Sequence, residues 1–168
     1  MDVSRKKGLV PDYVFRDVLN ITPDFLEKLG IKFLMMDLDN TIAAYDEHVL
    51  SSDIKEWLSN LKSSGIELFI ISNSTREKRV TTLSDSVGIA FTMRAGKPSC
   101  TSLIKAMDST NHKPYTSALV GDQIFTDGLA AKRAGITSIV IRPKRFTNPF
   151  LFIRYIIELP IRALCKNK

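Results

Sequence analysis

Two aspartates directly follow an apolar stretch early in the chain. Residues 33–36 are all apolar, and Asp37 and Asp39 come next, two positions apart. If the strand continues through them, both carboxylates point to the same side of it. Carboxylates this close repel each other unless one carries a proton or a cation lies between them. The pair therefore predicts an acid/base couple or a divalent metal site, both of which suit phosphoryl chemistry, with a plain Asp-rich turn as the alternative.

Two further polar groups follow in the middle of the chain. Ser72 and Asn73 end an apolar run over residues 66–72. A hydroxyl at the carboxyl end of a strand can donate to a phosphate oxygen. Lys97 comes next, and we expect Pro98 to lie near the first position of the helix that follows. Taken singly, a serine here is common in turns and a lysine is usually a solvated surface charge.

A fourth polar group ends the series. A short apolar stretch breaks at Gly121 and delivers Asp122, and Asp127 lies one loop further along. Acidic residues at strand ends are individually common, so neither aspartate is informative alone. Four such groups in this order would rarely arise by chance, because each strand-borne group falls at a carboxyl end.

In this order, the four groups resemble the four motifs of the haloacid dehalogenase (HAD) phosphohydrolase superfamily, over about residues 31–141. Three stretches further resemble the YqeG-type phosphatases of subclass IIIA, whose relatives include phosphatidylglycerophosphate phosphatases. They are Asp-Leu-Asp-Asn-Thr at 37–41, Gly-Lys-Pro at 96–98 and Gly-Asp-Gln-Ile-Phe-Thr-Asp at 121–127. The resemblance implies a phosphatase that requires Mg²⁺ and forms an aspartyl-phosphate intermediate.

The same resemblance implies a role for each residue. Asp37 is expected to attack the phosphorus, while Asp39 protonates the leaving oxygen and later takes a proton from the hydrolytic water. Ser72 and Lys97 are expected to hold the transferred phosphoryl group. Asn73 is a candidate for phosphate binding or for fixing its loop. The expected Mg²⁺ ligands are Asp37, the backbone carbonyl of Asp39, Asp122 and Asp127.

Length and hydrophobic patterning predict one α/β domain. The chain has 168 residues, of which 44% are hydrophobic, enough for one sizeable core. Apolar runs alternate with helical patterns, which indicates a doubly wound, Rossmann-like parallel sheet covered on both faces. The expected helices are 22–30, 51–64, 76–87, 99–111 and 126–134, and the expected strands are 31–36, 66–72, 89–92, 117–121 and 136–141.

In such sheets the site lies beyond the carboxyl ends of the strands, where the motifs fall. The intervals between the first three motifs are too short for an inserted cap domain. We therefore expect an HAD core with an open site, which in this superfamily resembles enzymes that act on large substrates. Phosphoprotein and nucleic-acid ends are the alternative substrates, and a non-catalytic adaptor is the alternative function.

Two cysteines, Cys100 and Cys165, are far apart and form no Cys-x-x-Cys or cysteine/histidine grouping. They predict neither a zinc site nor a disulfide framework and suit a reducing cytosol. The basic start of the chain is not followed by an apolar segment, and no later run reaches the ~18 apolar residues of a membrane span. We therefore expect a cytoplasmic protein that does not cross the membrane.

The chain divides into an HAD-like core with a short N-terminal helical lead, 1–141, and a basic C-terminal segment, 142–168. The segment contains seven basic residues and one acidic residue, and its charge of +6 equals that of the whole chain. Within 149–164 the only charges are Arg154, Glu158 and Arg162, each four apart. On a helix they form one narrow stripe beside a broad apolar face, and Pro160 should kink that helix.

The apolar face of this segment can be interpreted in two ways. The face either enters the interface of an anionic membrane or packs on the sheet or a second subunit. With the lipid-phosphatase resemblance, the first predicts a peripheral enzyme at the cytoplasmic face that converts phosphatidylglycerophosphate to phosphatidylglycerol. No specific nucleic-acid partner is expected, because the basic residues are interleaved with long aliphatic ones. The oligomeric state stays open.

Overall fold

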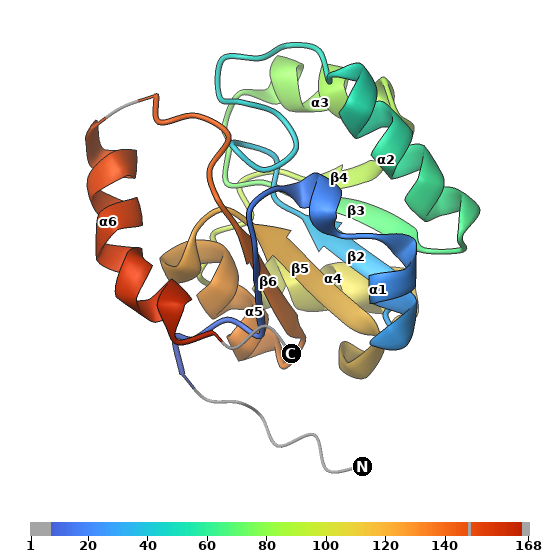
Figure 1. Ribbon diagram of the computed structural model, residues 1–168. Coiled ribbons are helices and arrows are strands. Elements are labelled where there is room, and N and C mark those ends of the chain that lie inside the picture. Colours follow the sequence, from blue (N-terminus) through green and yellow to red (C-terminus); the bar gives the residue numbers. More distant parts are fainter. Residues whose placement is uncertain (1–7, 148, 166–168) are drawn as a thin grey trace.

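The sheet has six parallel strands in the order β1-β6-β5-β2-β3-β4 (Figure 1). The computed structural model describes residues 8–147 and 149–165. The strands are β1 (Tyr13–Phe15), β2 (Phe33–Met36), β3 (Glu67–Ile71), β4 (Ala90–Thr92), β5 (Ser117–Gly121) and β6 (Thr137–Ile141). Because β2 lies between β3 and β5, the first, second and fourth motifs come from three neighbouring strands.

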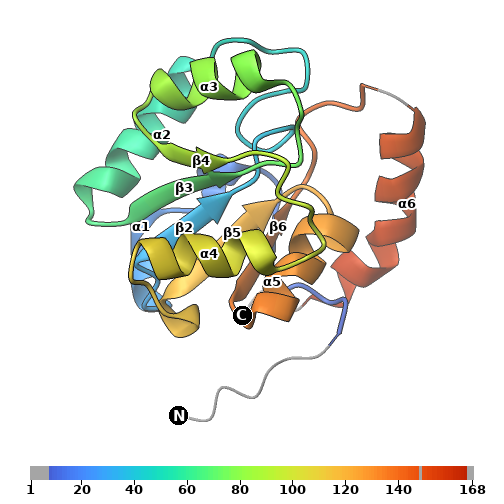
Figure 2. The ribbon, with the colours of Figure 1, turned by 180° about the vertical axis from the view of Figure 1, so that it is seen from behind.

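Helices cover both faces of the sheet, as Figures 1 and 2 show. In β2, Leu34 and Met36 pack in one core cluster, and Phe33 and Met35 pack in another. The first cluster includes residues of α1 (Pro23–Lys28), α2 (Ser52–Ser63) and α3 (Glu77–Asp85), and the second includes residues of α4 (Thr101–Ser109) and α5 (Leu129–Ala134). The predicted doubly wound parallel architecture is confirmed.

The helix starts follow from their capping residues. Thr22 accepts a hydrogen bond from the Phe25 amide at 3.2 Å, and Pro23 occupies the first turn of α1. Ser51 caps α2 in the same way. The buried residues of α2 are the four apolar ones at helical spacing: Ile54, Trp57, Leu58 and Leu61.

The structure differs from the sequence-based expectations at three places. Strand β1 was not predicted; it has only three residues and pairs with β6 at the sheet edge. The expectation for Pro98 was wrong, because α4 begins at Thr101 and Pro98 lies in the preceding turn. The Ser99 amide closes this turn by donating a hydrogen bond to the Gly96 carbonyl at 2.9 Å. Before α5 the chain forms a π-helical turn, η3 (Ile124–Gly128).

The last helix, α6 (Pro149–Ala163), stands at the side of the molecule in both views, next to α5 and η3 (Figures 1 and 2). It continues through Pro160. The remaining short helical turns are η1 (Val18–Asn20) and η2 (Pro114–Thr116). A loop over residues 37–51 joins β2 directly to α2, in agreement with an uncapped core. Within the described residues, no helix is both long enough and apolar enough to span a bilayer.

Candidate active site

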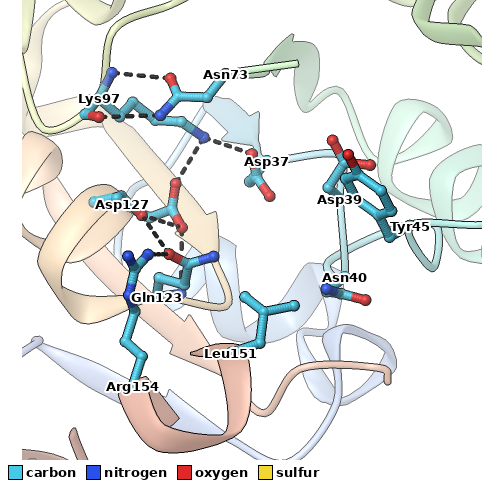
Figure 3. Close-up of a pocket in the computed structure, with 11 residues that line it drawn as sticks. Asp37, Asp39, Asn40, Tyr45, Asn73, Lys97, Gln123, Asp127, Leu151 and Arg154 are labelled. Atoms are coloured by element: carbon cyan, nitrogen blue, oxygen red, sulfur yellow. Dashed lines mark hydrogen bonds and ion pairs between the residues drawn. The ribbon is translucent and has the colours of Figure 1, made fainter. Parts of the chain in front are cut away.

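The motif residues meet at the carboxyl edge of the sheet. Asp37 follows β2, Ser72 follows β3 and Asp122 follows β5. Lys97 reaches them from the turn before α4. A pocket of about 310 Å³ opens here, and Asp37, Asp39, Asn73, Lys97 and Asp127 line it together with residues of α6 (Figure 3).

Lys97 is buried at the centre of this pocket wall. Its Nζ lies 2.6 Å from Asp37 Oδ1 and 2.6 Å from Asp127 Oδ1, and it donates to the Ile71 carbonyl at 2.7 Å. Burial lowers the pKa of Lys97, but the charges of Asp127 and Asp37 outweigh burial and raise the pKa above its ordinary value. Lys97 is therefore a fixed cation rather than a solvated surface charge.

Asn73 holds Lys97 in place. Its Nδ2 donates to the Lys97 carbonyl at 3.0 Å, and its Oδ1 accepts from the Lys97 amide at 2.9 Å. The side-chain amide thus ties the loop after β3 to the turn that carries Lys97. Asn73 was expected to bind phosphate or to fix its loop, and these two hydrogen bonds fix the loop.

Three carboxylates gather beside Lys97. Oxygens of Asp37, Asp122 and Asp127 lie within 4.8 Å of one another, and all three residues are buried. Burial raises the pKa of Asp37 to about 7, although Lys97 opposes this shift. Burial, followed by the charges of Asp37 and Asp127, raises the pKa of Asp122 well above its ordinary value. The cluster is thus strongly disfavoured in its fully ionised form when only protein surrounds it.

Asp122 carries the clearest sign of a missing partner. Both of its carboxylate oxygens are buried, and neither has a hydrogen-bond partner in the described part of the chain. Buried polar groups are nearly always hydrogen-bonded. A divalent cation bound between Asp37, Asp122 and Asp127 would satisfy these oxygens, and a buried all-oxygen donor set fits Mg²⁺.

Gly121 makes room for Asp127. A Cβ on Gly121 would lie 2.2 Å from Asp127 Cγ, a separation that packed atoms do not reach. Asp127 Oδ2 accepts from the Gln123 amide at 3.2 Å and from the Thr126 hydroxyl at 3.3 Å. Because Gly121 has no side chain, the Asp127 side chain can pack against the end of β5.

Asp39 lies apart from the carboxylate cluster. Its Oδ1 is 2.7 Å from Arg79 Nη1 and 3.5 Å from Arg76 Nη2. Strand β2 ends at Met36, as the predicted strand 31–36 does, and the amides of Thr41, Ile42 and Ala43 turn back to the Leu38 carbonyl. Strand alternation therefore does not apply to Asp39. Both carboxylates nevertheless line the pocket (Figure 3). The metal-ligand role of Asp39 concerns its backbone carbonyl and stays a prediction.

Sequence reasoning missed Arg79. This residue of α3 is only 4% exposed and also donates to the carbonyls of Glu47 at 2.8 Å and Ala44 at 2.7 Å. It holds the loop after β2 against α3 and so positions Asp39. The available signal was an arginine next to Val80 on the apolar side of a predicted helix, where a charge needs a partner.

Ser72 and Thr41 lie close to the pocket wall. Ser72 is fully buried, its Oγ accepts from the Ser74 amide at 3.0 Å, and it is not among the residues that line the pocket. Its phosphate-binding role stays a prediction. Thr41 donates to Asp37 Oδ2 at 3.4 Å and helps to orient that carboxylate.

Helix α6 supports the fourth motif with its polar stripe. Glu158 is 1% exposed and accepts from the amides of Ile124 at 2.8 Å and Phe125 at 3.3 Å, at the start of η3. Arg162 donates to the carbonyls of Ile141 and Asp122 and pairs with Glu158 at 2.8 Å. Glu158 and Arg162 therefore face the protein. The alternative in which the apolar face packs on the sheet was wrong, because that face is exposed.

The comparisons with known proteins agree with this geometry. A family model described as mitochondrial PGP phosphatase matches residues 3–144. The "Probable phosphatase YqeG" of Bacillus subtilis (strain 168) is 32% identical over 146 residues, which cover 87% of this chain and 84% of that protein.

Solved structures share the fold at low sequence identity. One is the 3-deoxy-D-manno-octulosonate 8-phosphate phosphatase of Moraxella catarrhalis in complex with magnesium, phosphate and KDO. It has a TM-score of 0.54 and 16% identity, with 86% of this chain and 95% of that chain covered. Another is the cobalt-bound phosphatase YrbI of Haemophilus influenzae, with a TM-score of 0.52, 15% identity, and coverage of 82% and 93%.

The family match spans most of the chain, and the phosphatase fold places the four motif groups at one edge of the sheet. The chain therefore belongs to the PGP phosphatase family of HAD-type phosphatases, and it is a phosphomonoester hydrolase.

Proposed function

We propose that this enzyme removes the terminal phosphate of phosphatidylglycerophosphate and leaves phosphatidylglycerol. The observation that carries the proposed chemistry is the buried cluster in which Asp37 contacts Lys97 and Asp122 has no hydrogen-bond partner among the described residues. Such a site suits a dianionic phosphoryl group that arrives with a divalent cation. The family name and the similarity to YqeG support the substrate.

In the first proposed step, an oxygen of Asp37 attacks the phosphorus. The bond from phosphorus to the glycerol oxygen breaks, and Asp39 gives its proton to that oxygen. Lys97, fixed by Asn73, offsets charge on the phosphoryl oxygens. Thr41 keeps the attacking carboxylate oriented through its hydrogen bond to Oδ2.

In the second step, Asp39 takes a proton from water, and the water oxygen attacks the phosphorus of aspartyl-phosphate. The bond between Asp37 and phosphorus breaks, which frees inorganic phosphate and restores both carboxyl groups. Mg²⁺, held by Asp37, Asp122, Asp127 and the Asp39 carbonyl, would neutralise the carboxylates and polarise the phosphoryl group. Arg79 holds Asp39 at the pocket wall and so positions it for both steps.

The size of the pocket is compatible with a lipid headgroup. Its volume of about 310 Å³ is near the lower end of the ~300–1,000 Å³ range of ligand sites. A glycerophosphate headgroup fits such a volume, and acyl chains would have to remain outside. Arg154 of α6 lines the pocket with an exposed side chain that contacts Gln123. We assign this arginine to the second phosphate, the diester of the substrate.

The test is phosphate release from four substrates side by side, with Mg²⁺ and with EDTA. The substrates are phosphatidylglycerophosphate in mixed micelles, a phosphopeptide, a phosphorylated oligonucleotide and a sugar phosphate. We expect the lipid to give the highest kcat/KM and EDTA to abolish turnover. The Arg154→Ala variant should raise KM for the lipid while leaving hydrolysis of an aryl phosphate unchanged. Preference for one of the other three substrates would contradict the proposal.

A further inference from the structure

Helix α6 presents an apolar face to solvent. The described residues include fourteen exposed large hydrophobic side chains, and seven of them lie between Phe150 and Leu164. Phe150 is 82% exposed, Leu164 68% and Ile157 58%. The other four are Phe152, Ile153, Ile156 and Leu159. We call these seven side chains, six on the helix and Leu164 directly after it, the outer face of α6. An apolar patch of this kind marks an interaction surface.

The outer face is held outward by the contacts on the opposite side of the helix. Glu158 and Arg162 are anchored to η3, β6 and the Asp122 carbonyl. The Tyr155 ring packs against Phe146 with centroids 5.2 Å apart. Rotating the helix to bury its apolar face would separate Glu158 and Arg162 from these backbone partners. It would also remove a buried ion pair from its site. The exposure is therefore built into the fold.

The charge of the region selects the occupant. The segment 142–168 carries all of the chain's net charge of +6. In the described part of this segment, Arg142 and Arg145 are exposed in the stretch before α6, and Arg145 pairs with Asp46; Lys166 and Lys168 lie outside the described residues. Two copies of the chain meeting at this face would bring like charges together. An anionic bilayer accepts both the apolar side chains and the cations.

We propose that the outer face of α6 is a docking surface for an anionic lipid bilayer. The helix has 15 residues and lies in the interface without spanning it. Leu151 and Arg154, which belong to the same helix, line the catalytic pocket. Docking thus places the pocket beside the headgroup layer, and a lipid substrate need not leave the bilayer completely. This deepens the proposed function and rests on it only for the choice of a lipid substrate.

The test compares the double variant Ile153→Asp/Ile157→Asp with the control Ile104→Asp/Tyr115→Asp. Ile104 on α4 and Tyr115 on η2 are also exposed, at 42% and 67%. Both variants change the net charge equally, so any difference comes from position. Binding is measured by co-sedimentation with vesicles of phosphatidylcholine and phosphatidylglycerol and with vesicles of phosphatidylcholine alone. Neither vesicle contains the proposed substrate, which separates docking from substrate choice.

We expect the α6 variant to lose about a hundredfold in vesicle partitioning, because two large apolar side chains no longer enter the interface. The control should bind like the wild type. Both variants should keep the wild-type melting temperature and hydrolysis of a soluble aryl phosphate. Unchanged vesicle binding by the α6 variant would overturn the proposal, as would equal binding of the wild type to both kinds of vesicle. A wild-type dimer in light scattering that the α6 variant splits, without vesicle binding, would assign the face to a second copy.

Discussion

Two regions of this enzyme bury charged side chains, and they do so in opposite ways. At the strand ends, three carboxylates lie within 4.8 Å, and Asp122 has no hydrogen-bond partner in the described structure. In α6, Glu158 and Arg162 have opposite charges, contact each other and also reach backbone groups of neighbouring elements. The first arrangement sets one cation, Lys97, against three carboxylates, whereas the second pairs two opposite charges with each other.

The difference separates a site from its support. Like charges buried together store unfavourable energy that a ligand can relieve, so they indicate chemistry. An ion pair whose two charges offset each other fixes one packing arrangement and leaves no net charge for a ligand to neutralise. Removing a charge should therefore have opposite consequences in the two regions: activity is lost at the strand ends, and stability is lost in α6.

The largest expected effect is on turnover. Asp37→Asn should reduce kcat by at least about a thousandfold, because an amide cannot supply the attacking oxygen anion. The fold should persist, since Lys97 keeps Asp127 and the Ile71 carbonyl as partners. Steady-state kinetics and circular dichroism measure the two quantities. Activity within about tenfold of wild type would remove Asp37 from its role as nucleophile.

Breaking the complete pair should instead cost stability. Arg162→Met leaves Glu158 buried and unpaired and should lower the free energy of unfolding by about 3–5 kcal/mol in urea titrations. The control is Arg145→Met, which removes an exposed pair with Asp46 and should cost at most about 1 kcal/mol. Adding Glu158→Gln to Arg162→Met should restore part of the loss. Equal effects of the two single substitutions would contradict the comparison.

A glycine substitution tests how tightly the carboxylate cluster is packed. Gly121→Ala should displace Asp127 and reduce kcat by about tenfold or more, with a stability loss of about 1–3 kcal/mol. Gly135→Ala is the matched control: it strains a backbone with φ +72 but contacts nothing within 4 Å. The control should lose about 1 kcal/mol of stability and keep its kcat. Normal Mg²⁺ dependence and turnover in Gly121→Ala would show that Asp127 tolerates displacement.

The smallest expected effect is a pH dependence of the stability of the metal-free protein. Burial raises the pKa of Asp37 from 3.8 to about 7, and the pKa of Asp122 is also raised. Between those values the folded state binds more protons than the unfolded chain, so stability falls as the pH rises through this window. In EDTA, urea titrations should give lower stability at about pH 7 than at about pH 5, and Mg²⁺ should offset the loss more strongly at the higher pH.

The same comparison run on Asp122→Asn sharpens this prediction. The substitution removes one uncompensated carboxylate, so the metal-free variant should lose stability less steeply with rising pH than the wild type. Its stabilisation by Mg²⁺ should shrink as well. A wild-type protein whose stability in EDTA increases between about pH 5 and about pH 7 would contradict the electrostatic account of the cluster.

The sequence by itself determined where the site forms. Apolar runs that end in Asp37, Ser72 and Asp122 predict parallel strands, and parallel strands bring their carboxyl ends to one edge. The capping residues Thr22 and Ser51 likewise mark helix starts as local chemistry requires. These features need only neighbouring residues and a periodic pattern, which is why they could be predicted.

Tertiary structure decided which partner each charged side chain meets. Asp39 finds Arg79 forty positions away, and Arg162 finds the Asp122 carbonyl at the same separation. Helical periodicity correctly placed the charged side chains of α6 on one stripe, but it could not tell whether that stripe faces solvent or protein. That choice depended on the amides at the start of η3, which bind Glu158, and on the carbonyl at the end of β6, which binds Arg162. Leaving these buried polar groups without partners would cost more free energy than exposing the apolar face does.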